Sequence, residues 1–223
     1  MWIVWAIHSN PGGSSLTDPE LAKMIAGYYG MVSMLDHHIG RVLDELDRLG
    51  LAEDTVVIVS CDHGEWLGDH GLIFKGPIHY EGLLRVPLIV RGPGFAPGSV
   101  VADPVGTIDL APTMLGAAGI AVPDDMQGRP LLDGAREYVL TENDHQMVLD
   151  IPLRTITTDR WKLTRYEAMA GVGELYDLTD DPGEFDNRWD DPACAGVQRD
   201  LLALLDEVMN HDPVHGEMVG LVA

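Results

Sequence analysis

Cysteine is scarce in this sequence. Only Cys61 and Cys194 occur among its 223 residues, and neither lies at metal-ligand spacing. Two cysteines are too few for a disulfide framework. The fold must therefore rest on a hydrophobic core, and the apolar share of 46% is ordinary for a globular chain.

Basic residues are also few. Lys and Arg number 14 against 36 Asp and Glu, which gives a formal net charge of -22. Such a surface repels nucleic acid and anionic membranes, so we expect neither as a partner. It repels anionic esters as well, so any sulfate or phosphate site must obtain local positive potential from Lys, His and a metal ion. A strongly acidic surface is also a common means of staying soluble.

Long apolar runs are missing. None approaches the roughly 20 residues of a membrane-spanning helix. The opening stretch, residues 1–7, lacks the basic start and the small-residue cleavage site of a signal peptide, and is better interpreted as a core strand. No signal peptide is therefore predicted, and a complete chain would be cytoplasmic. A longer gene product could carry a targeting segment upstream, which leaves localisation unknown.

The N-terminal part of the chain carries the pattern of a long helix. Apolar residues recur with helical period from Leu21 to Leu49. Thr17 and Glu20 have the spacing of a capping box at its start, and Gly50 supplies a left-handed stop after its end. We therefore predict one amphipathic helix with clear borders.

Strands and a second helix are predicted after it. Residues 55–61 and 86–90 are apolar without polar alternation, which is typical of strands buried on both faces. A helix followed by such a strand predicts a doubly wound sheet. A further helix is predicted at residues 107–119, and these elements form a predicted domain over residues 1–135.

Residues 136–223 form a second predicted domain. Short segments that alternate apolar and polar residues predict an antiparallel sheet with one solvent-exposed face. These segments are residues 138–141, 153–158, 160–166 and 174–178. The turn at Asp159-Arg160 suits a hairpin, and an amphipathic helix from Pro192 to Met209 would cover the other face.

Asp62 and His63 directly follow the predicted strand at residues 55–61. In open α/β sheets, ligands bind beyond the carboxyl ends of the strands. A carboxylate beside an imidazole suits a divalent cation. In the simpler interpretation, Asp62 caps a turn and His63 is a surface residue. The spacing alone leaves both open.

A glycine-rich loop follows at residues 64–80, and loops of this length are often functional. Lys75 and His79 are its cationic candidates for contact with sulfate or phosphate oxygens. A solvated lysine is the simpler alternative. A second Asp-His-Gly, at residues 69–71, could also supply ligands, although turn formation explains it as well.

Three segments of the chain resemble the second signature region of the sulfatases: residues 62–72, Lys75-Gly76 and residues 80–94. Residues 28–36, 109–115 and 173–184 are similar to further segments of that family in the same order. The resemblance covers about residues 20–205. The chain is therefore similar to the C-terminal portion of an arylsulfatase-like member of the alkaline-phosphatase superfamily.

The resemblance implies an α/β fold of the alkaline-phosphatase type, with a mixed sheet flanked by helices and a small C-terminal subdomain of antiparallel strands plus a helix. It implies that Asp62 and His63 bind a divalent metal ion, usually Ca²⁺, with Mg²⁺ or Mn²⁺ as alternatives, and that Lys75 contacts the sulfate group. His79 has no firm counterpart and is a substrate-side candidate because of its closeness to Lys75. The implied reaction is hydrolysis of a small-molecule sulfate ester.

Two family features have no counterpart in the sequence. These are the Cys/Ser-x-Pro/Ala-x-Arg motif, which supplies the formylglycine nucleophile, and the Asp-Asp-x-Arg metal-binding pair. We therefore expect that the N-terminal half of the catalytic domain is not in this chain, that apolar faces are left uncovered and that the isolated chain is nearly inactive. A partner chain carrying that half would restore the mechanism. Two alternatives stay open: a phosphodiesterase or phosphonate hydrolase of the same superfamily, and a non-catalytic fragment or interaction subunit.

Overall fold

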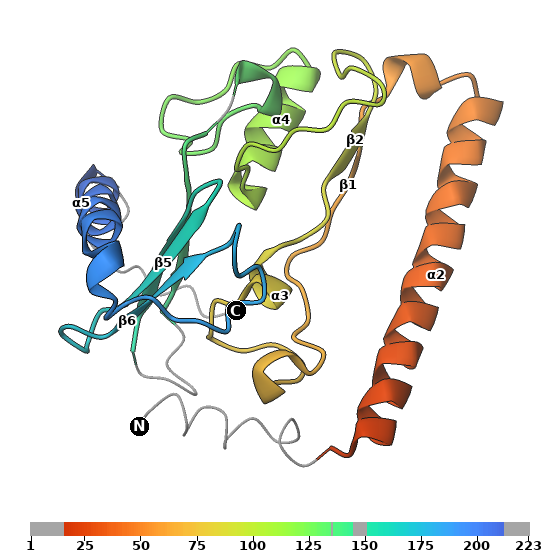
Figure 1. Cartoon of the computed structure of the whole chain (residues 1–223). Helices are drawn as coiled ribbons and strands as arrows, with labels where there is room; N and C mark the ends of the chain where they lie inside the picture. Colours follow the sequence, from red (N-terminus) through yellow and green to blue (C-terminus); the bar gives the residue numbers. More distant parts are fainter. Residues whose placement is uncertain (1–15, 135, 145–150, 212–223) are drawn as a thin grey trace. The chain divides into compact units, whose positions relative to one another are not determined.

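The structure is a computed structural model (Figure 1) that describes residues 16–134, 136–144 and 151–211. The strand expected at residues 1–7 lies outside the described residues. The chain divides into two compact units, residues 1–135 and residues 136–223. None of the described helices is both long and apolar enough to cross a membrane.

The first unit begins with helix α2, Asp18–Arg48, where the sequence pattern predicts it. The backbone N–H of Thr17 donates to Glu20 Oε2 at 2.9 Å, and the Thr17 hydroxyl donates to the same oxygen at 2.7 Å. These hydrogen bonds fix the start of the helix. Gly50, just past its end, has a φ of +69°, so the predicted left-handed stop is also confirmed.

Much of the apolar stripe of α2 is exposed. No residue of the helix is buried. Tyr29, Leu35 and Val42 keep 63%, 58% and 61% of their surface exposed. An amphipathic period normally indicates a packed face, so the period predicts the helix correctly while the described part of the chain leaves the stripe largely uncovered.

Strands β1, Val57–Val59, and β2, Ile89–Arg91, form a two-stranded antiparallel sheet in which Ile58 pairs with Val90. β1 is half-buried, and Ile89 of β2 is 63% exposed. The strands predicted here exist but are shorter, and burial on both faces and a doubly wound sheet are wrong for the described residues. An apolar run shows that a strand could be buried on both faces, but it does not show whether other elements cover it. Here each strand pairs with one neighbour, and few described residues cover its faces.

The other elements of this unit are short: η2 (Ala52–Asp54), η3 (Asp69–Gly71), α3 (Glu81–Leu84), η4 (Thr107–Asp109), α4 (Leu110–Ala117) and η5 (Leu131–Asp133). The predicted helix at residues 107–119 is confirmed as η4 continued by α4. Two buried side chains tie it to the following segment. Asp109 Oδ1 accepts from the Arg129 N–H at 2.8 Å, and Thr113 Oγ1 accepts from the Leu131 N–H at 2.9 Å.

The second unit contains a four-stranded antiparallel sheet in the order β3-β4-β5-β6. Its strands are β3 (Val139–Asn143), β4 (Leu153–Thr157), β5 (Trp161–Tyr166) and β6 (Gly173–Asp177). The Thr158 N–H donates to the Trp161 carbonyl oxygen at 2.8 Å and closes the hairpin between β4 and β5. The predicted strands and the hairpin at Asp159-Arg160 are therefore confirmed.

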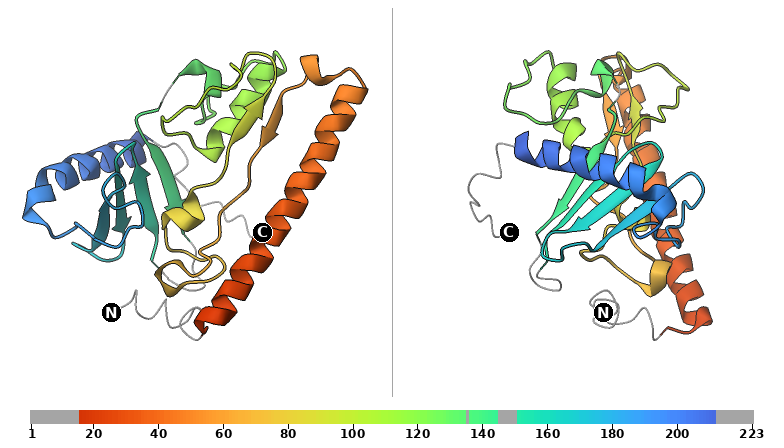
Figure 2. Two further views of the ribbon diagram at one scale, coloured as in Figure 1. Left: turned by 45° about the vertical axis from the view of Figure 1, so that its right-hand side comes forward. Right: turned by 60° about the vertical axis from the view of Figure 1, so that its left-hand side comes forward.

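Helix α5, Ala195–His211, follows η6, Pro192–Cys194, and covers one face of this sheet (Figure 2). The predicted helix is thus confirmed. Side chains of the helix and of three strands form the core: Leu201, Leu205, Ile156, Leu163 and Leu175. The second unit therefore has a hydrophobic core built from its own residues.

The opposite face of the sheet is polar but buried, so the expected solvent-exposed face is wrong. Lys162 and Glu184 form an ion pair in which their side chains are 0% and 2% exposed. The Oγ1 atoms of Thr155 and Thr164 share a hydrogen bond of 2.7 Å. Because these polar side chains find partners within the face, the face can be buried even though it is polar, and sequence alternation cannot distinguish it from a face in water.

Glu174 belongs to the same face and is 2% exposed. Its Oε1 accepts from the Tyr166 hydroxyl at 2.9 Å, while its Oε2 has no hydrogen-bond partner within the described residues. Burial raises the pKa of Glu174 to about 7, and the Tyr166 hydrogen bond partly opposes that rise. The carboxyl group is therefore partly protonated at neutral pH.

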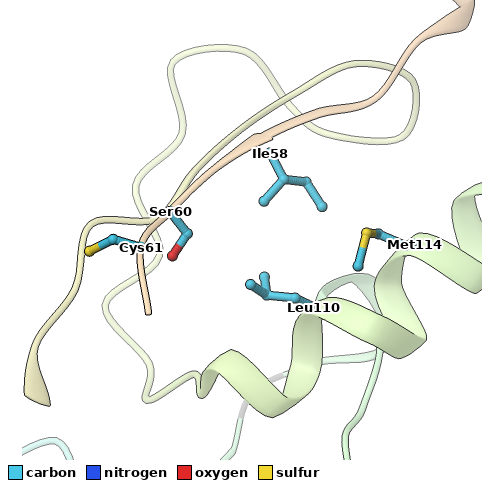
Figure 3. A pocket seen from close by; sticks show the side chains of 5 residues that line it. All are labelled: Ile58, Ser60, Cys61, Leu110 and Met114. Carbon is cyan, nitrogen blue, oxygen red and sulfur yellow. The ribbon is translucent and has the colours of Figure 1, made fainter. Parts of the chain in front are cut away.

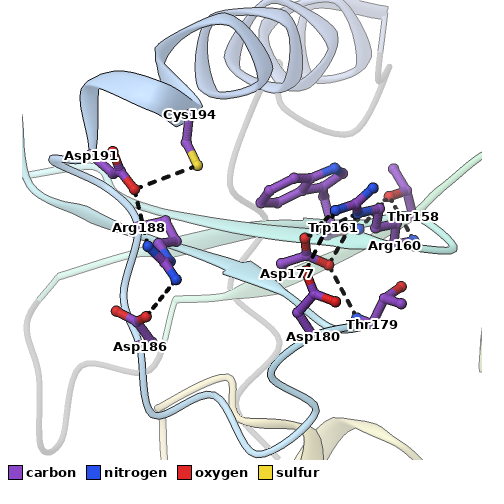
Figure 4. Close-up of polar contacts among 10 residues, drawn as sticks. All are labelled: Thr158, Arg160, Trp161, Asp177, Thr179, Asp180, Asp186, Arg188, Asp191 and Cys194. Atoms are coloured by element: carbon purple, nitrogen blue, oxygen red, sulfur yellow. Dashed lines mark hydrogen bonds and ion pairs between the residues drawn. The ribbon is translucent and has the colours of Figure 1, made fainter.

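Ion pairs join the turn before β5 to the end of β6 and link residues of the segment that follows β6 (Figure 4). Arg160 donates to both carboxylate oxygens of Asp177, with distances of 2.6 to 3.1 Å. Arg188 lies 2.7 Å from Asp186 and 3.1 Å from Asp191. The Arg160 side chain is 52% exposed, so water screens its pair and the contribution to stability is small.

Candidate functional site

The carboxyl end of β1 leads into the two residues predicted as metal ligands. The side chain of Asp62 is 84% exposed and that of His63 is 36% exposed. The backbone N–H of His63 donates to Asp62 Oδ1 at 3.0 Å and makes the largest contribution to lowering the pKa of Asp62 below its usual value. Asp62 therefore presents an ionised carboxylate at neutral pH.

His63 lies between the loop backbone and Lys75. Its Nδ1 is 2.7 Å from the Gly64 carbonyl oxygen, which can only accept a hydrogen bond, so Nδ1 carries a proton. Nε2 then offers a lone pair, to which Lys75 Nζ donates at 3.1 Å. Asp62 Oδ2 is 3.6 Å from the same Nε2. The structure thus brings together three of the four predicted site residues.

Gly64 fixes the backbone beside His63 through a close approach to α3. Its N–H donates to the Leu83 carbonyl oxygen at 2.7 Å. A Cβ atom at Gly64 would lie 2.1 Å from the Gly82 carbonyl oxygen, so no side chain fits there. The glycine of Asp62-His63-Gly64 is therefore a steric requirement of the site.

His79 is buried, with 2% of its surface exposed. The contacts described above for Asp62, His63 and Lys75 involve other residues. A substrate-side role for His79 stays a prediction.

The second Asp-His-Gly forms a turn, η3. His70 has a φ of +53°, and its ring stacks on Tyr80 with 3.7 Å between the ring centroids. The parts of the chain that the structure describes hold no group of three or more His, Cys, Asp or Glu side chains able to bind a metal ion. Asp62 and His63 fit a divalent cation by donor chemistry, as an ionised carboxylate beside an imidazole lone pair. They would supply two ligands of a larger shell.

A cavity of about 330 Å³ lies between β1 and α4 (Figure 3), lined by Ile58, Ser60, Cys61, Leu110 and Met114. The Ser60 hydroxyl points toward Leu110, whereas the Cys61 thiol points away. Burial raises the pKa of the Cys61 thiol, and the neighbouring Asp62 carboxylate raises it further. Cys61 therefore stays protonated at neutral pH and is not prepared to act as a thiolate nucleophile.

Sequence reasoning missed the structural role of Trp66 and Gly76 in the loop. Trp66 is 2% exposed, and a Cβ atom at Gly76 would lie 2.6 Å from Trp66 Cη2. The available signal was a large aromatic residue inside a glycine-rich loop, which indicates a packed loop rather than a flexible one.

Known proteins are similar to this chain in both sequence and fold. Residues 7–120 match the family described as Sulfatase, and residues 68–211 match the family described as N-sulphoglucosamine sulphohydrolase, C-terminal. Arylsulfatase K of Bos taurus is 32% identical over 185 residues, which cover 77% of this chain and 34% of that protein.

Two solved structures extend the comparison. A phosphonate monoester hydrolase from Silicibacter pomeroyi is similar with a TM-score of 0.79 and 30% identity, over 95% of this chain and 47% of that one. The structure of the protein BT4656 in complex with its substrate, D-glucosamine-2-N,6-O-disulfate, is similar with a TM-score of 0.72 and 29% identity, over 83% of this chain and 41% of that one.

The fold is therefore the alkaline-phosphatase-like α/β fold of the sulfatases. The family matches, each covering at least half of the chain, make the assignment more specific: the chain belongs to the sulfatase family. It spans less than half the length of each of these relatives.

Proposed function

We propose that this chain supplies the cation-binding and sulfate-binding side of the active site of a sulfuric ester hydrolase. The observation that carries the proposal is the distance of 3.1 Å between Lys75 Nζ and His63 Nε2, with Asp62 Oδ2 3.6 Å from the same nitrogen. A cation site and an ammonium group at one strand end would provide the local positive potential that an anionic ester requires in a chain of net charge -22.

Each residue has a distinct proposed role. Asp62 and His63 would hold a divalent cation, Ca²⁺ before Mg²⁺ or Mn²⁺, and the bound ion would polarise the ester oxygens. His63 Nε2 has one lone pair, so Lys75 loses this acceptor when Nε2 serves as a ligand. The N–H groups of the Lys75 ammonium are then available to a sulfate oxygen, and they offset the charge of the sulfate group in the transition state. The reaction adds water across the ester bond and releases an alcohol, sulfate and a proton.

Hydrolysis of a phosphonate monoester is the second candidate function. It is favoured by the phosphonate monoester hydrolase of Silicibacter pomeroyi, which is 30% identical and covers 95% of this chain. The same cation and ammonium suit phosphorus esters, because these also present anionic oxygens to the site.

The nucleophile is proposed to come from residues outside this sequence, in the same protein or in a partner chain. No Cys/Ser-x-Pro/Ala-x-Arg motif and no Asp-Asp-x-Arg pair occurs in this sequence. The proposed segment or partner carries both, and it would complete the metal shell that Asp62 and His63 begin. A non-catalytic interaction subunit is the alternative for a chain that works without such a partner.

Calcium binding by the purified chain tests the cation site. We expect isothermal titration calorimetry to detect weak binding, and Asp62→Asn to lower the affinity at least about tenfold because a charged ligand is lost. Asp69→Asn is the matched control, since it makes the same change in the second Asp-His-Gly. Equal affinity in all three proteins would refute the site.

Turnover tests the reaction. With a co-expressed partner that carries the formylglycine motif, we expect hydrolysis of 4-nitrophenyl sulfate to exceed that of a 4-nitrophenyl phosphonate ester. Lys75→Ala should lower kcat/KM by about 10²-fold or more, while Lys23→Ala on α2 should leave it unchanged. A preference for the phosphonate would select the second candidate, and no turnover of either ester would leave the non-catalytic alternative.

A further inference from the structure

We propose that Trp66 is a positioning residue that holds Lys75 beside the cation site. The inference rests on the proposed function, because it concerns the lysine to which sulfate contact is assigned. Its geometric content can be tested separately, in the chain without a partner or substrate.

Trp66 contacts the backbone on both sides of Lys75. The backbone N–H of Trp66 donates to the carbonyl oxygen of Phe74 at 3.1 Å. Its indole ring lies against Gly76, where an added Cβ would approach Cη2 to 2.6 Å and Cζ3 to 3.0 Å. A single buried residue therefore fixes the residues that precede and follow the lysine.

Lys75 needs this support because its own side chain is weakly held. The residue is exposed, and within the described part of the chain its one side-chain hydrogen bond is that to His63. Phe74 has a φ of +63°, a left-handed conformation that is unfavourable for a residue with a side chain. The hydrogen bond from Trp66 opposes relaxation of that strained backbone, which would otherwise carry Lys75 away from His63.

The support from the indole ring is steric rather than polar. Trp66 is 2% exposed, yet its indole N–H has no hydrogen-bond partner among the described residues. A buried donor without an acceptor lowers stability. The indole ring therefore acts through its shape, and phenylalanine, which lacks the Cη2 and Cζ3 atoms that lie against Gly76, should preserve only part of its function.

Nuclear magnetic resonance on the full chain tests the proposal. In the wild type we expect a nuclear Overhauser contact between the side-chain methylenes of Lys75 and the His63 imidazole protons. Trp66→Ala should abolish it, and Trp66→Phe should weaken it less. Leu72→Ala is the matched control: Leu72 is 1% exposed in the same loop, and its truncation should reduce stability while keeping the contact.

A second pair of variants tests the proposal if Trp66→Ala disorders the loop, because these variants change the size of the side chain at Gly76. Gly76→Ala keeps the indole but forces a methyl group against it, so we expect the Lys75–His63 contact to be lost. The double variant Trp66→Ala/Gly76→Ala gives that methyl room and should recover part of the contact.

In an active complex, Trp66→Ala should lower kcat/KM for the sulfate ester by about 10²-fold, as expected for a misplaced catalytic group, and Trp66→Phe should lower it less. A contact that persists in Trp66→Ala, or is lost equally in Leu72→Ala, would overturn the proposal. Loss of the contact in Trp66→Ala alone, with no ester hydrolysis by any complex, would refute the proposed function while Trp66 still positions Lys75.

Discussion

The two units of this chain differ in how they bury their apolar residues. The second unit packs a helix on a sheet and excludes Leu163, Leu175 and Leu205 fully from solvent. The first unit carries the proposed chemistry, yet its longest helix has no buried residue and β2 is largely exposed. The helix-on-sheet core therefore lies in one unit and the proposed reactive residues lie in the other.

The largest effect that could break this comparison is expected from core truncation. Leu163→Ala in the second unit should lower the free energy of unfolding by about 2–5 kcal/mol, because it removes buried contacts and leaves a cavity. Leu35→Ala on α2 makes the same change at a side chain that is 58% exposed, and should alter stability by less than about 0.5 kcal/mol. Urea denaturation followed by circular dichroism measures both, and equal losses would contradict the contrast.

A smaller, pH-dependent effect should mark the buried polar face. The pKa of Glu174 is about 7 in the fold against 4.5 for a free carboxyl, so the folded state retains a proton that the unfolded state releases. The contribution of Glu174 to the free energy of unfolding should be fully present below about pH 4.5, fall by up to about 1.4 kcal/mol per pH unit as pH rises to about 7, and then level off.

Glu174→Gln removes this titration, so it should be more stable than the wild type at about pH 8. Denaturation at about pH 5 and pH 8 tests this, and the exposed Glu53→Gln serves as the control that keeps the wild-type slope. An unchanged slope in Glu174→Gln would show that the buried face is not the source.

The smallest effect is expected at the surface of the second unit. Arg160→Ala removes the pair with Asp177, but the Arg160 side chain is 52% exposed, so the free energy of unfolding should fall by less than about 1 kcal/mol. Added salt should reduce the difference between the two proteins further. A loss comparable to that of Leu163→Ala would show that these ion pairs belong to the stabilising core.

The helices and the C-terminal strands could be predicted because their signals are local. A helical period, the Thr17 and Glu20 pair and a following Gly50 define α2 within the segment itself. Burial could not be predicted in the same way, because it depends on neighbours. The same alternation describes a strand facing water and β5, where Lys162 meets a carboxylate from a distant loop.

The site divides along the same line. Asp62, His63 and Lys75 could be singled out from a motif, and the placement of Lys75 beside His63 follows from the path of the loop between them. That path depends on the close approach of Gly64 to Gly82 and on the contact of Trp66 with Gly76, neither of which any spacing pattern encodes. The burial of His79 lay beyond sequence reasoning for the same reason.

The buried pair of Lys162 and Glu184 also constrains how this sequence can change over evolution. Replacing either residue alone leaves an uncompensated charge in a buried site, at a cost of about 3–5 kcal/mol, whereas replacing both with apolar residues is often neutral. One position is in β5 and the other is in the loop after β6. Replacing the pair by two apolar residues therefore requires a destabilising single substitution first. We expect Lys162 and Glu184 to have been inherited together, and to change together when they change at all.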